Sequence, residues 1–217
     1  MHYARLCFSI GLLLVVGTAP GQGQDKKPMV YTSPFYPLRV GNEWTYKVTV
    51  GDAPAEQKVV ITVDEAEPYD YKFAQDQKEV TAPIVRYRLK VVSGFKELTE
   101  HVAVLKDGVY RFTTAMKEIA PPLRFLKLPL TKGETWKVNS TSENVQLSGT
   151  FTCADDKVTV PAGEFQAKHV SSKDFLLGTE KMALDYWFAE CVGIVKQHVH
   201  VGNSDVLLEL KEFKSGN

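Results

Sequence analysis

The sequence is poor in cysteine and has no excess of charge of either sign. Only three of its 217 residues are cysteine, and 26 basic side chains balance 26 acidic ones. So few cysteines exclude a small domain held together by many disulfides. The balanced charge argues against a nucleic-acid-binding protein, which needs a basic excess to neutralise phosphates. Hydrophobic residues make up 44% of the chain, enough to bury a sizeable core.

Familiar catalytic and cofactor-binding motifs are also missing. The sequence contains no G-x-S-x-G nucleophile motif, no glycine-rich phosphate loop and no C-x-x-C pair. We therefore expect no cofactor, and the sequence favours a protein that is not an enzyme. A hydrolase whose site is assembled from separate strands stays open, because such a site is defined by geometry and leaves no sequence motif.

One hydrophobic run stands out, and it lies at the start of the chain. Residues 6–16 are apolar apart from Ser9 and Gly11, they follow the basic residue Arg5, and small or polar residues occupy positions 17–24. The run is too short to span a membrane, and the order of these segments is typical of a secretory signal peptide. The alternative is a buried N-terminal helix.

We accordingly predict a signal peptide over residues 1–23 and a mature chain over residues 24–217 with no transmembrane segment. Such a protein would be exported, to the periplasm or outside the cell. The mature chain keeps two cysteines, Cys153 and Cys191, both at the ends of predicted strands. In an oxidising compartment they are a candidate disulfide. The alternative is two free, buried thiols.

Hydrophobic and polar residues alternate along most of the mature chain. Every second side chain is aromatic or aliphatic in residues 44–50, and residues 85–91, 182–188 and 206–210 repeat the pattern. Residues 195–201 follow it at Val195, Val199 and Val201. This period of two is typical of antiparallel strands with one buried face. Residues 106–109, 160–165 and 202–205 carry the glycine, proline and asparagine residues of hairpin turns.

These signals predict a single all-β domain over residues 24–217. We expect about twelve strands in an antiparallel curved sheet, a half-barrel or a barrel. Two short stretches, residues 69–78 and 114–119, are potentially helical.

An internal repeat is the most specific feature of the sequence. Residues 37–44 and 129–136 share proline, leucine, glycine and tryptophan at the same spacing, and residues 107–111 and 192–196 form a second, weaker match. The repeat is longer than the units of solenoid proteins, so we interpret it as two related halves of one fold, residues 35–120 and 127–213. The alternative is a chance match between similar turns.

Three segments resemble a group of exported bacterial β-proteins. They are residues 35–46 (FYPLRVGNEWTY), residues 158–165 (VTVPAGEF) and residues 186–196 (YWFAECVGIVK). The group's late segment usually has Pro-Gly where this chain has Glu190 and Cys191. The resemblance implies an exported, mostly antiparallel protein akin to periplasmic half-barrels that carry lipid or lipoprotein. It implies no activity and transfers no functional residue.

Two histidines offer a weak alternative as metal ligands. His198 and His200 lie on the same face of one predicted strand, a spacing that can bind zinc if a neighbouring strand supplies a third ligand. His169 and Glu209 are candidates for that ligand. The apolar residues lie on the opposite face, so we interpret the two histidines as solvated and predict no metal site.

The function that the sequence favours is that of an exported, non-enzymatic binding module. Its concave face would hold an apolar ligand such as a lipid, or pack on an envelope partner. Besides the hydrolase, a structural envelope protein that buries a sheet edge against a partner is an alternative.

Overall fold

The computed structural model describes residues 27–51, 57–75 and 78–216, and the predicted signal peptide lies outside these ranges. The described chain contains twelve β-strands and no helix, which confirms the predicted fold class. The strands are β1 (Glu43–Val50), β2 (Gln57–Gln75), β3 (Lys78–Ser93), β4 (Lys96–Leu105), β5 (Gly108–Thr114), β6 (Lys117–Lys127), β7 (Thr135–Ser142), β8 (Val145–Val160), β9 (Gly163–Leu177), β10 (Glu180–Ala189), β11 (Gly193–Val201) and β12 (Ser204–Lys214).

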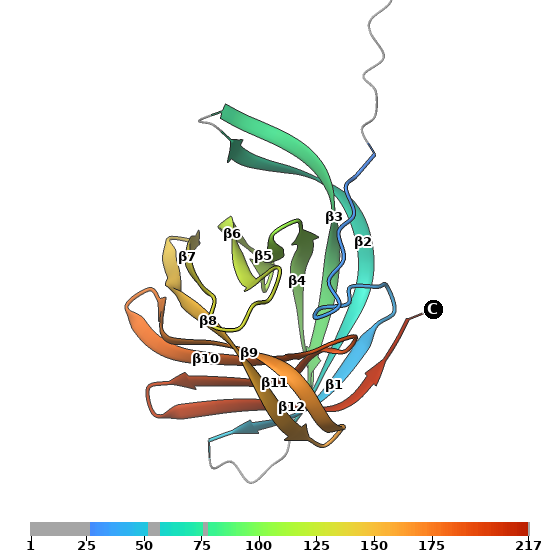
Figure 1. Ribbon diagram of the computed structural model, residues 1–217, viewed down its shortest axis with the longest axis vertical. Helices are drawn as coiled ribbons and strands as arrows, with labels where there is room; N and C mark the ends of the chain where they lie inside the picture. Colours follow the sequence, from blue (N-terminus) through green and yellow to red (C-terminus); the bar gives the residue numbers. More distant parts are fainter. Residues whose placement is uncertain (1–26, 52–56, 76–77, 217) are drawn as a thin grey trace, which may run out of the picture.

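The strands form one closed antiparallel barrel in which each strand pairs with its neighbours in sequence (Figure 1). The barrel closes because β1 pairs with β12, with Glu43 opposite Lys214 at one end of the ladder and Val50 opposite Val206 at the other. Three of the predicted turns occur as tight hairpins, which join β4 to β5, β8 to β9 and β11 to β12. In the second of these, Gly163 has φ +131°, a conformation that glycine tolerates best.

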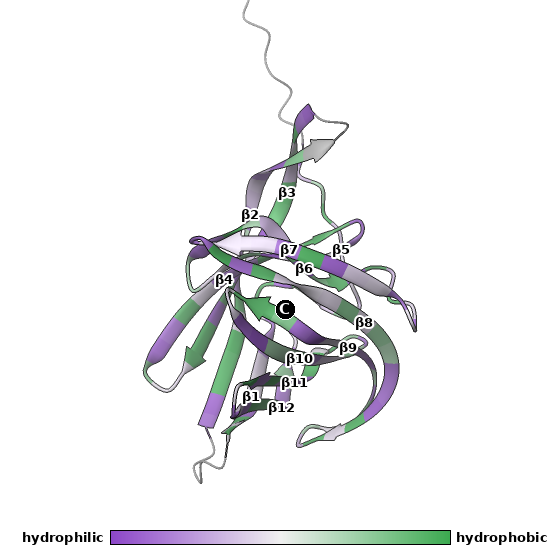
Figure 2. Ribbon diagram, turned by 90° about the vertical axis from the view of Figure 1, so that its left-hand side faces the viewer, coloured by the Kyte–Doolittle hydropathy of each residue, from purple (hydrophilic) through white to green (hydrophobic). Residues whose placement is uncertain are grey.

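Side-chain alternation places one face of each strand inside the barrel. On β7, Trp136, Val138 and Ser140 are buried, whereas the residues between them are exposed. Hydrophobic and hydrophilic bands alternate along the strands for this reason (Figure 2). Burying one apolar face of every strand is the main driving force for closing the sheet.

The two stretches predicted as potentially helical are strands, so that prediction is wrong. Residues 69–75 end β2 and Lys78 begins β3, while residues 114–119 span the β5–β6 hairpin. Tyr69, Tyr71 and Phe73 alternate with polar residues, and this period of two outweighs the helix-forming residues nearby. The rings of Tyr69 and Tyr71 pack against Phe112 of β5, which a strand conformation permits and a helix would disturb.

The space enclosed by the barrel is filled by side chains and by the segment that precedes β1. Tyr36 of this segment is buried, and its ring lies 5.5 Å from the ring of Phe125 and 6.3 Å from that of Trp44. Phe151, Phe188 and many aliphatic side chains of the wall complete the core. The concave face of the sheet is therefore the core of the protein rather than an open ligand cavity.

The two segments matched by the internal repeat have the same local hydrogen bonds. The Gly41 amide donates to the Val63 carbonyl at 2.8 Å, and the Gly133 amide donates to the Cys153 carbonyl at 2.7 Å. The amides of Val63 and Cys153 donate back to the residues that follow the two glycines, both at 2.9 Å. This agreement is local, and the two-half origin of the fold stays a prediction.

The pairing around the barrel is uneven. The β2–β3 and β8–β9 ladders extend over most of their strands, whereas β6 and β7 pair only through Ala120 and Thr141. Pro121 and Pro122 of β6 have no amide hydrogen to donate, so a regular ladder cannot form beside them. Two side-chain bonds connect the strands instead, from Thr141 Oγ1 to the Ala120 carbonyl and from the Trp136 indole to the Arg124 carbonyl, both at 3.0 Å.

Candidate binding groove

A long hairpin extends beyond the barrel and forms one side of the candidate site. Strand β3 begins to pair with β4 only at Tyr87, so residues 66–75 of β2 and 78–86 of β3 project as a two-stranded arm. Figure 1 shows this arm curving away from the end of the barrel. Contacts between its aromatic rings and β5 hold the arm over the outer face of the wall.

A groove runs between the arm and the barrel wall, and we call it the arm groove. It consists of three hollows of about 660, 400 and 260 Å³, and Tyr71 lines all of them. Aromatic and proline rings line it on both sides, together with charged and polar side chains. The arm contributes Tyr69, Tyr71 and Phe73, and the wall contributes Tyr110, Phe112, Pro121 and Pro122.

The rings of the groove support one another. Tyr69 and Tyr71 each meet Phe112 edge to face, at centroid distances of 5.5 and 5.3 Å, and Tyr71 stacks on Phe73 at 5.5 Å. Such geometries are the favourable ones for aromatic pairs. Because these four rings hold one another in place, this part of the groove is preformed, as most ligand sites are.

Charged groups lie at the first end of the groove. The Arg86 guanidinium covers the Tyr69 ring at 4.1 Å and donates to Glu67 Oε1 from Nε at 2.8 Å. His101 lies beside this pair, with Nε2 at 3.8 Å from Glu67 Oε1 and Nδ1 at 3.0 Å from Thr113 Oγ1. Burial lowers the pKa of His101, and the nearby Arg86 charge lowers it further, so the imidazole is neutral at physiological pH.

This cluster is the arrangement that bears most directly on the hydrolase alternative. A histidine beside a hydroxyl and a carboxylate is the geometry that nucleophilic catalysis requires. However, the Thr113 side chain is buried (7% exposed), and its oxygen also accepts the His101 backbone amide at 3.0 Å. The hydroxyl thus joins β5 to β4 and is not presented to a substrate. The cluster gives the groove a polar boundary.

Hydroxyl groups mark the other end of the groove. The Tyr110 hydroxyl donates to Asp107 Oδ2 at 2.9 Å, and the same oxygen accepts Arg124 Nη1 at 2.7 Å. Burial raises the pKa of both Tyr110 and Tyr71, and the Asp107 charge adds to the effect. Both phenols therefore remain protonated. The Tyr110 hydrogen is already donated to Asp107, so this hydroxyl can only accept a further hydrogen bond, whereas the Tyr71 hydroxyl can donate one at the groove surface.

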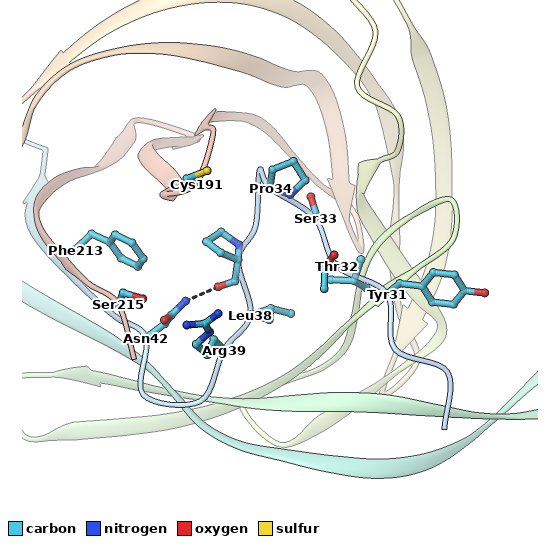
Figure 3. A pocket seen from close by; sticks show the side chains of 12 residues that line it. Tyr31, Thr32, Ser33, Pro34, Leu38, Arg39, Asn42, Cys191, Phe213 and Ser215 are labelled. Carbon is cyan, nitrogen blue, oxygen red and sulfur yellow. Dashed lines mark hydrogen bonds between the residues drawn. The ribbon is translucent and has the colours of Figure 1, made fainter. Parts of the chain in front are cut away.

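A further hollow of about 490 Å³ lies at the mouth of the barrel, between the wall and the segment before β1 (Figure 3). One hydrogen bond joins the segment to the β10–β11 turn, and a second one lies within the segment. The Cys191 amide donates to the Pro34 carbonyl at 2.7 Å, and Asn42 Nδ2 donates to the Pro37 carbonyl at 2.8 Å. Most of the lining residues belong to this segment, from Tyr31 to Asn42, so the segment itself is the main boundary of the hollow.

The predicted disulfide is not formed, and strand order explains why. Cys153 is buried on β8, whereas Cys191 is exposed in the turn between β10 and β11. Strand β9 lies between β8 and β10, with Cys153 opposite Val170 and Val170 opposite Tyr186. Two inter-strand spacings separate the cysteines by about 9–10 Å or more, which exceeds the Cα separation that a disulfide can bridge.

His198 and His200 share a carboxylate on the neighbouring strand. His198 Nε2 lies 2.7 Å and His200 Nδ1 lies 2.9 Å from Asp205 Oδ1. Neither residue named as a third metal ligand joins them, because His169 bonds with Asp185 and Glu209 lies opposite Lys196. Within residues 27–51, 57–75 and 78–216, no group of three or more His, Cys, Asp or Glu side chains is arranged to hold a metal ion.

The sequence did not identify the arm groove. Its aromatic residues lie in segments 69–73, 110–112 and 121–122, which are far apart in sequence. The alternation of Tyr69, Tyr71 and Phe73 was the available signal, and it was obscured by the surrounding charged and helix-forming residues. The contact between the arm and β5 follows from the curvature of a long hairpin, which has no sequence motif.

Comparisons with known proteins give the fold but no family. No protein-family model matches the chain, and no curated protein does. A solved structure from Bacteroides fragilis, described as a candidate exported protein with a YmcC-like fold, is similar with a TM-score of 0.52 and 14% identity. The match covers 83% of this chain and 99% of that one. The chain shares the fold of this protein.

A second solved structure, described as a candidate lipoprotein from Parabacteroides distasonis, has a TM-score of 0.48 and 11% identity, covering 85% of this chain and 100% of that one. The part of the chain that the structure describes contains no helix long and apolar enough to cross a membrane.

Proposed function

We propose that the protein is an exported, non-enzymatic binding module that holds an apolar ligand, such as a lipid, in the arm groove. The observation that carries this proposal is the convergence of three hollows on Tyr71, between two walls of aromatic and proline rings. The largest hollow has the size that is typical of sites for small ligands. The N-terminal segment with the features of a signal peptide supports export, as does the description of the Bacteroides fragilis neighbour.

The groove matches an amphipathic molecule better than a polar one. Its long walls offer ring faces, on which an acyl chain or another extended apolar group can lie. Polar groups gather at the two ends, at Arg86 and at the Tyr110–Asp107–Arg124 cluster, and Asp70, Lys72 and Glu118 also line the largest hollow. The headgroup of such a ligand would contact one end of the groove, and its acyl chain would lie along the rings.

The test is to purify the mature chain, extract it with organic solvent and identify bound lipid by mass spectrometry. In parallel, 1-anilinonaphthalene-8-sulfonate serves as the fluorescent probe of the groove. Tyr71→Ala should weaken probe binding about tenfold, because a ring common to all three hollows is lost. Tyr71→Phe is the matched control, since it keeps the ring and removes only the hydroxyl.

Two results would overturn the proposal. One is an extract without lipid together with no probe binding to the native chain. The other is equal probe binding by Tyr71→Ala and the native chain. Phe95→Ala, on a hairpin at the opposite end of the barrel, should leave binding at the groove unchanged.

A further inference from the structure

The hollow at the mouth of the barrel, which we call the mouth hollow, has the size of a small-ligand site. Its volume of about 490 Å³ lies within the range that is typical of such sites. Phe213 of β12 and Cys191 of the β10–β11 turn line it on one side of the barrel, and Val104 of β4 lines it on the other. Figure 3 shows Phe213, Cys191 and Arg39 around this space.

Hydrogen bonds and ring contacts fix the walls of the mouth hollow. The Asn42 side chain is bonded at both of its polar atoms, because Nδ2 donates to the Pro37 carbonyl and Oδ1 accepts the Gly216 amide, each at 2.8 Å. The Phe213 ring stacks on the buried Trp44 ring at a centroid distance of 5.3 Å. The hollow is therefore preformed, and one of its walls is an aromatic ring held in place.

A single positive charge faces this preformed space. Of the described residues that line the mouth hollow, Arg39 is the one with a charged side chain. Within residues 27–51, 57–75 and 78–216, no carboxylate forms an ion pair with it. Three acidic residues adjoin the lining in sequence, but Glu43 and Glu212 both pair with Lys214, at 3.1 and 3.4 Å, and Glu190 lines a separate hollow. An arginine without a carboxylate partner favours a ligand that carries an anionic group.

The fold does not need an arginine at this position. Residues 39–42 form a turn in which the Asn42 amide donates to the Arg39 carbonyl at 3.0 Å. The matching turn of the internal repeat has the same bond, from the Glu134 amide to the Thr131 carbonyl at 3.1 Å. A threonine thus serves the turn as well as an arginine does. The exposed guanidinium remains available to a ligand.

We propose that the mouth hollow binds a small amphipathic anion, whose carboxylate or phosphate group pairs with Arg39 and whose apolar part lies against Phe213 and Leu38. The planar guanidinium can donate two parallel hydrogen bonds to either kind of group. This site is separate from the arm groove and does not depend on the ligand of the groove. Tyr31 lines both spaces, so the test leaves it unaltered.

Cys191 provides a readout of the mouth hollow, because it lines the hollow and is exposed, whereas Cys153 is buried. The probe is octanoate, and the rate at which N-ethylmaleimide alkylates Cys191 in the mature chain is followed by mass spectrometry. Bound octanoate should slow the alkylation. Arg39→Gln should raise the octanoate concentration for half-maximal protection about tenfold, because the charge-assisted pair is lost. The uncharged 1-octanol should protect Cys191 less well than octanoate does.

Two matched variants control for the change in charge. Arg39→Lys keeps the positive charge and should keep most of the protection. Lys132→Gln removes an exposed positive charge from the matching turn of the repeat and should behave like the native chain. The unfolding midpoint of Arg39→Gln in urea should equal that of the native chain, since the side chain is exposed. Octyl phosphate, tested beside octanoate, identifies which anionic group the site prefers.

The proposal is overturned if octanoate and octyl phosphate both leave the alkylation rate unchanged. It is also overturned if Arg39→Gln is protected as well as the native chain, or if 1-octanol protects as well as octanoate. Protection by either anion that depends on Arg39 supports it. Tyr71→Ala should leave the protection of Cys191 unchanged, so failure of this proposal and failure of the arm groove can be recognised separately.

Discussion

Burial changes the protonation of individual side chains, and His101 is the clearest case. Its ring lies between Thr113 and the Arg86–Glu67 pair, and burial is the main reason why its pKa is lowered. The folded protein therefore resists protonation of this ring more than the unfolded chain does. Stability that depends on the neutral ring is complete above about pH 6.5, the ordinary histidine pKa, and is lost as the pH falls below it.

His101→Gln should therefore flatten the pH dependence of stability. Between about pH 7 and pH 5 the native chain should lose stability more steeply than the variant, because only the native chain must hold a neutral imidazole. The measurement is the free energy of unfolding in urea at a series of pH values. Parallel curves for the two proteins would show that His101 does not carry the effect.

The two cysteines should differ in reactivity. Cys191 is exposed, whereas Cys153 is 1% exposed and burial raises the pKa of its thiol. A thiol reagent should modify Cys191 in the folded mature chain and reach Cys153 only after unfolding. A reducing agent should leave the melting temperature unchanged. A mature chain without free thiols would contradict the structure.

At the scale of elements, two tryptophans fix the starts of their strands. The Trp44 indole of β1 donates to the Val192 carbonyl at 2.6 Å, and the Trp136 indole of β7 donates to the Arg124 carbonyl at 3.0 Å. Both rings are buried. Each indole therefore ties a strand to a distant segment of the barrel.

Trp44→Phe and Trp136→Phe should each lower the free energy of unfolding by about 1–3 kcal/mol, because a partly buried carbonyl loses its partner and the smaller ring leaves space in the core. Chemical denaturation of the two variants measures this. Lys47→Ala, an exchange of a half-buried polar side chain in the middle of β1, should change stability by about 0.5 kcal/mol or less. Equal stability of Trp44→Phe and the native chain would rule out the anchoring role.

The sequence predicted elements well where one strand face is uniformly apolar. Residues 85–91 and 182–188 have that pattern, and both lie in strands. The arm was misread because Glu67 and Pro68 interrupt the alternation and because ring contacts with β5, rather than a local preference, fix its conformation. The disulfide prediction failed for a similar reason, since the strand between two cysteines cannot be read from their spacing.

At the scale of the whole molecule, the β6–β7 seam is the weakest part of the wall. In the ladder between β6 and β7, Ala120 and Thr141 form a single residue pair. Elsewhere the ladders contribute backbone hydrogen bonds along most of their length. Local opening starts where few such bonds have to break.

Amide hydrogen exchange should reveal this seam. The amides of β7 that face β6 should exchange faster than those of β9, which has a long ladder on each side. Native-state exchange followed by NMR or mass spectrometry makes the comparison. Equal protection of the β7 and β9 amides would contradict this. It would show that the side-chain bonds of Trp136 and Thr141 prevent opening between β6 and β7 as well as backbone hydrogen bonds do elsewhere.

The closure of the barrel has a consequence for the order of events during folding. Glu43 and Lys214 are 171 positions apart in the sequence, yet they lie opposite one another where β1 meets β12. The contact can form only once the whole chain is available, and contacts of such high sequence separation form slowly. Until then β1 and β12 each have an unpaired strand edge, which promotes aggregation. A chain that is threaded through a translocon from its N-terminus would therefore reach its destination before the barrel can close, which suits transport in an unfolded state.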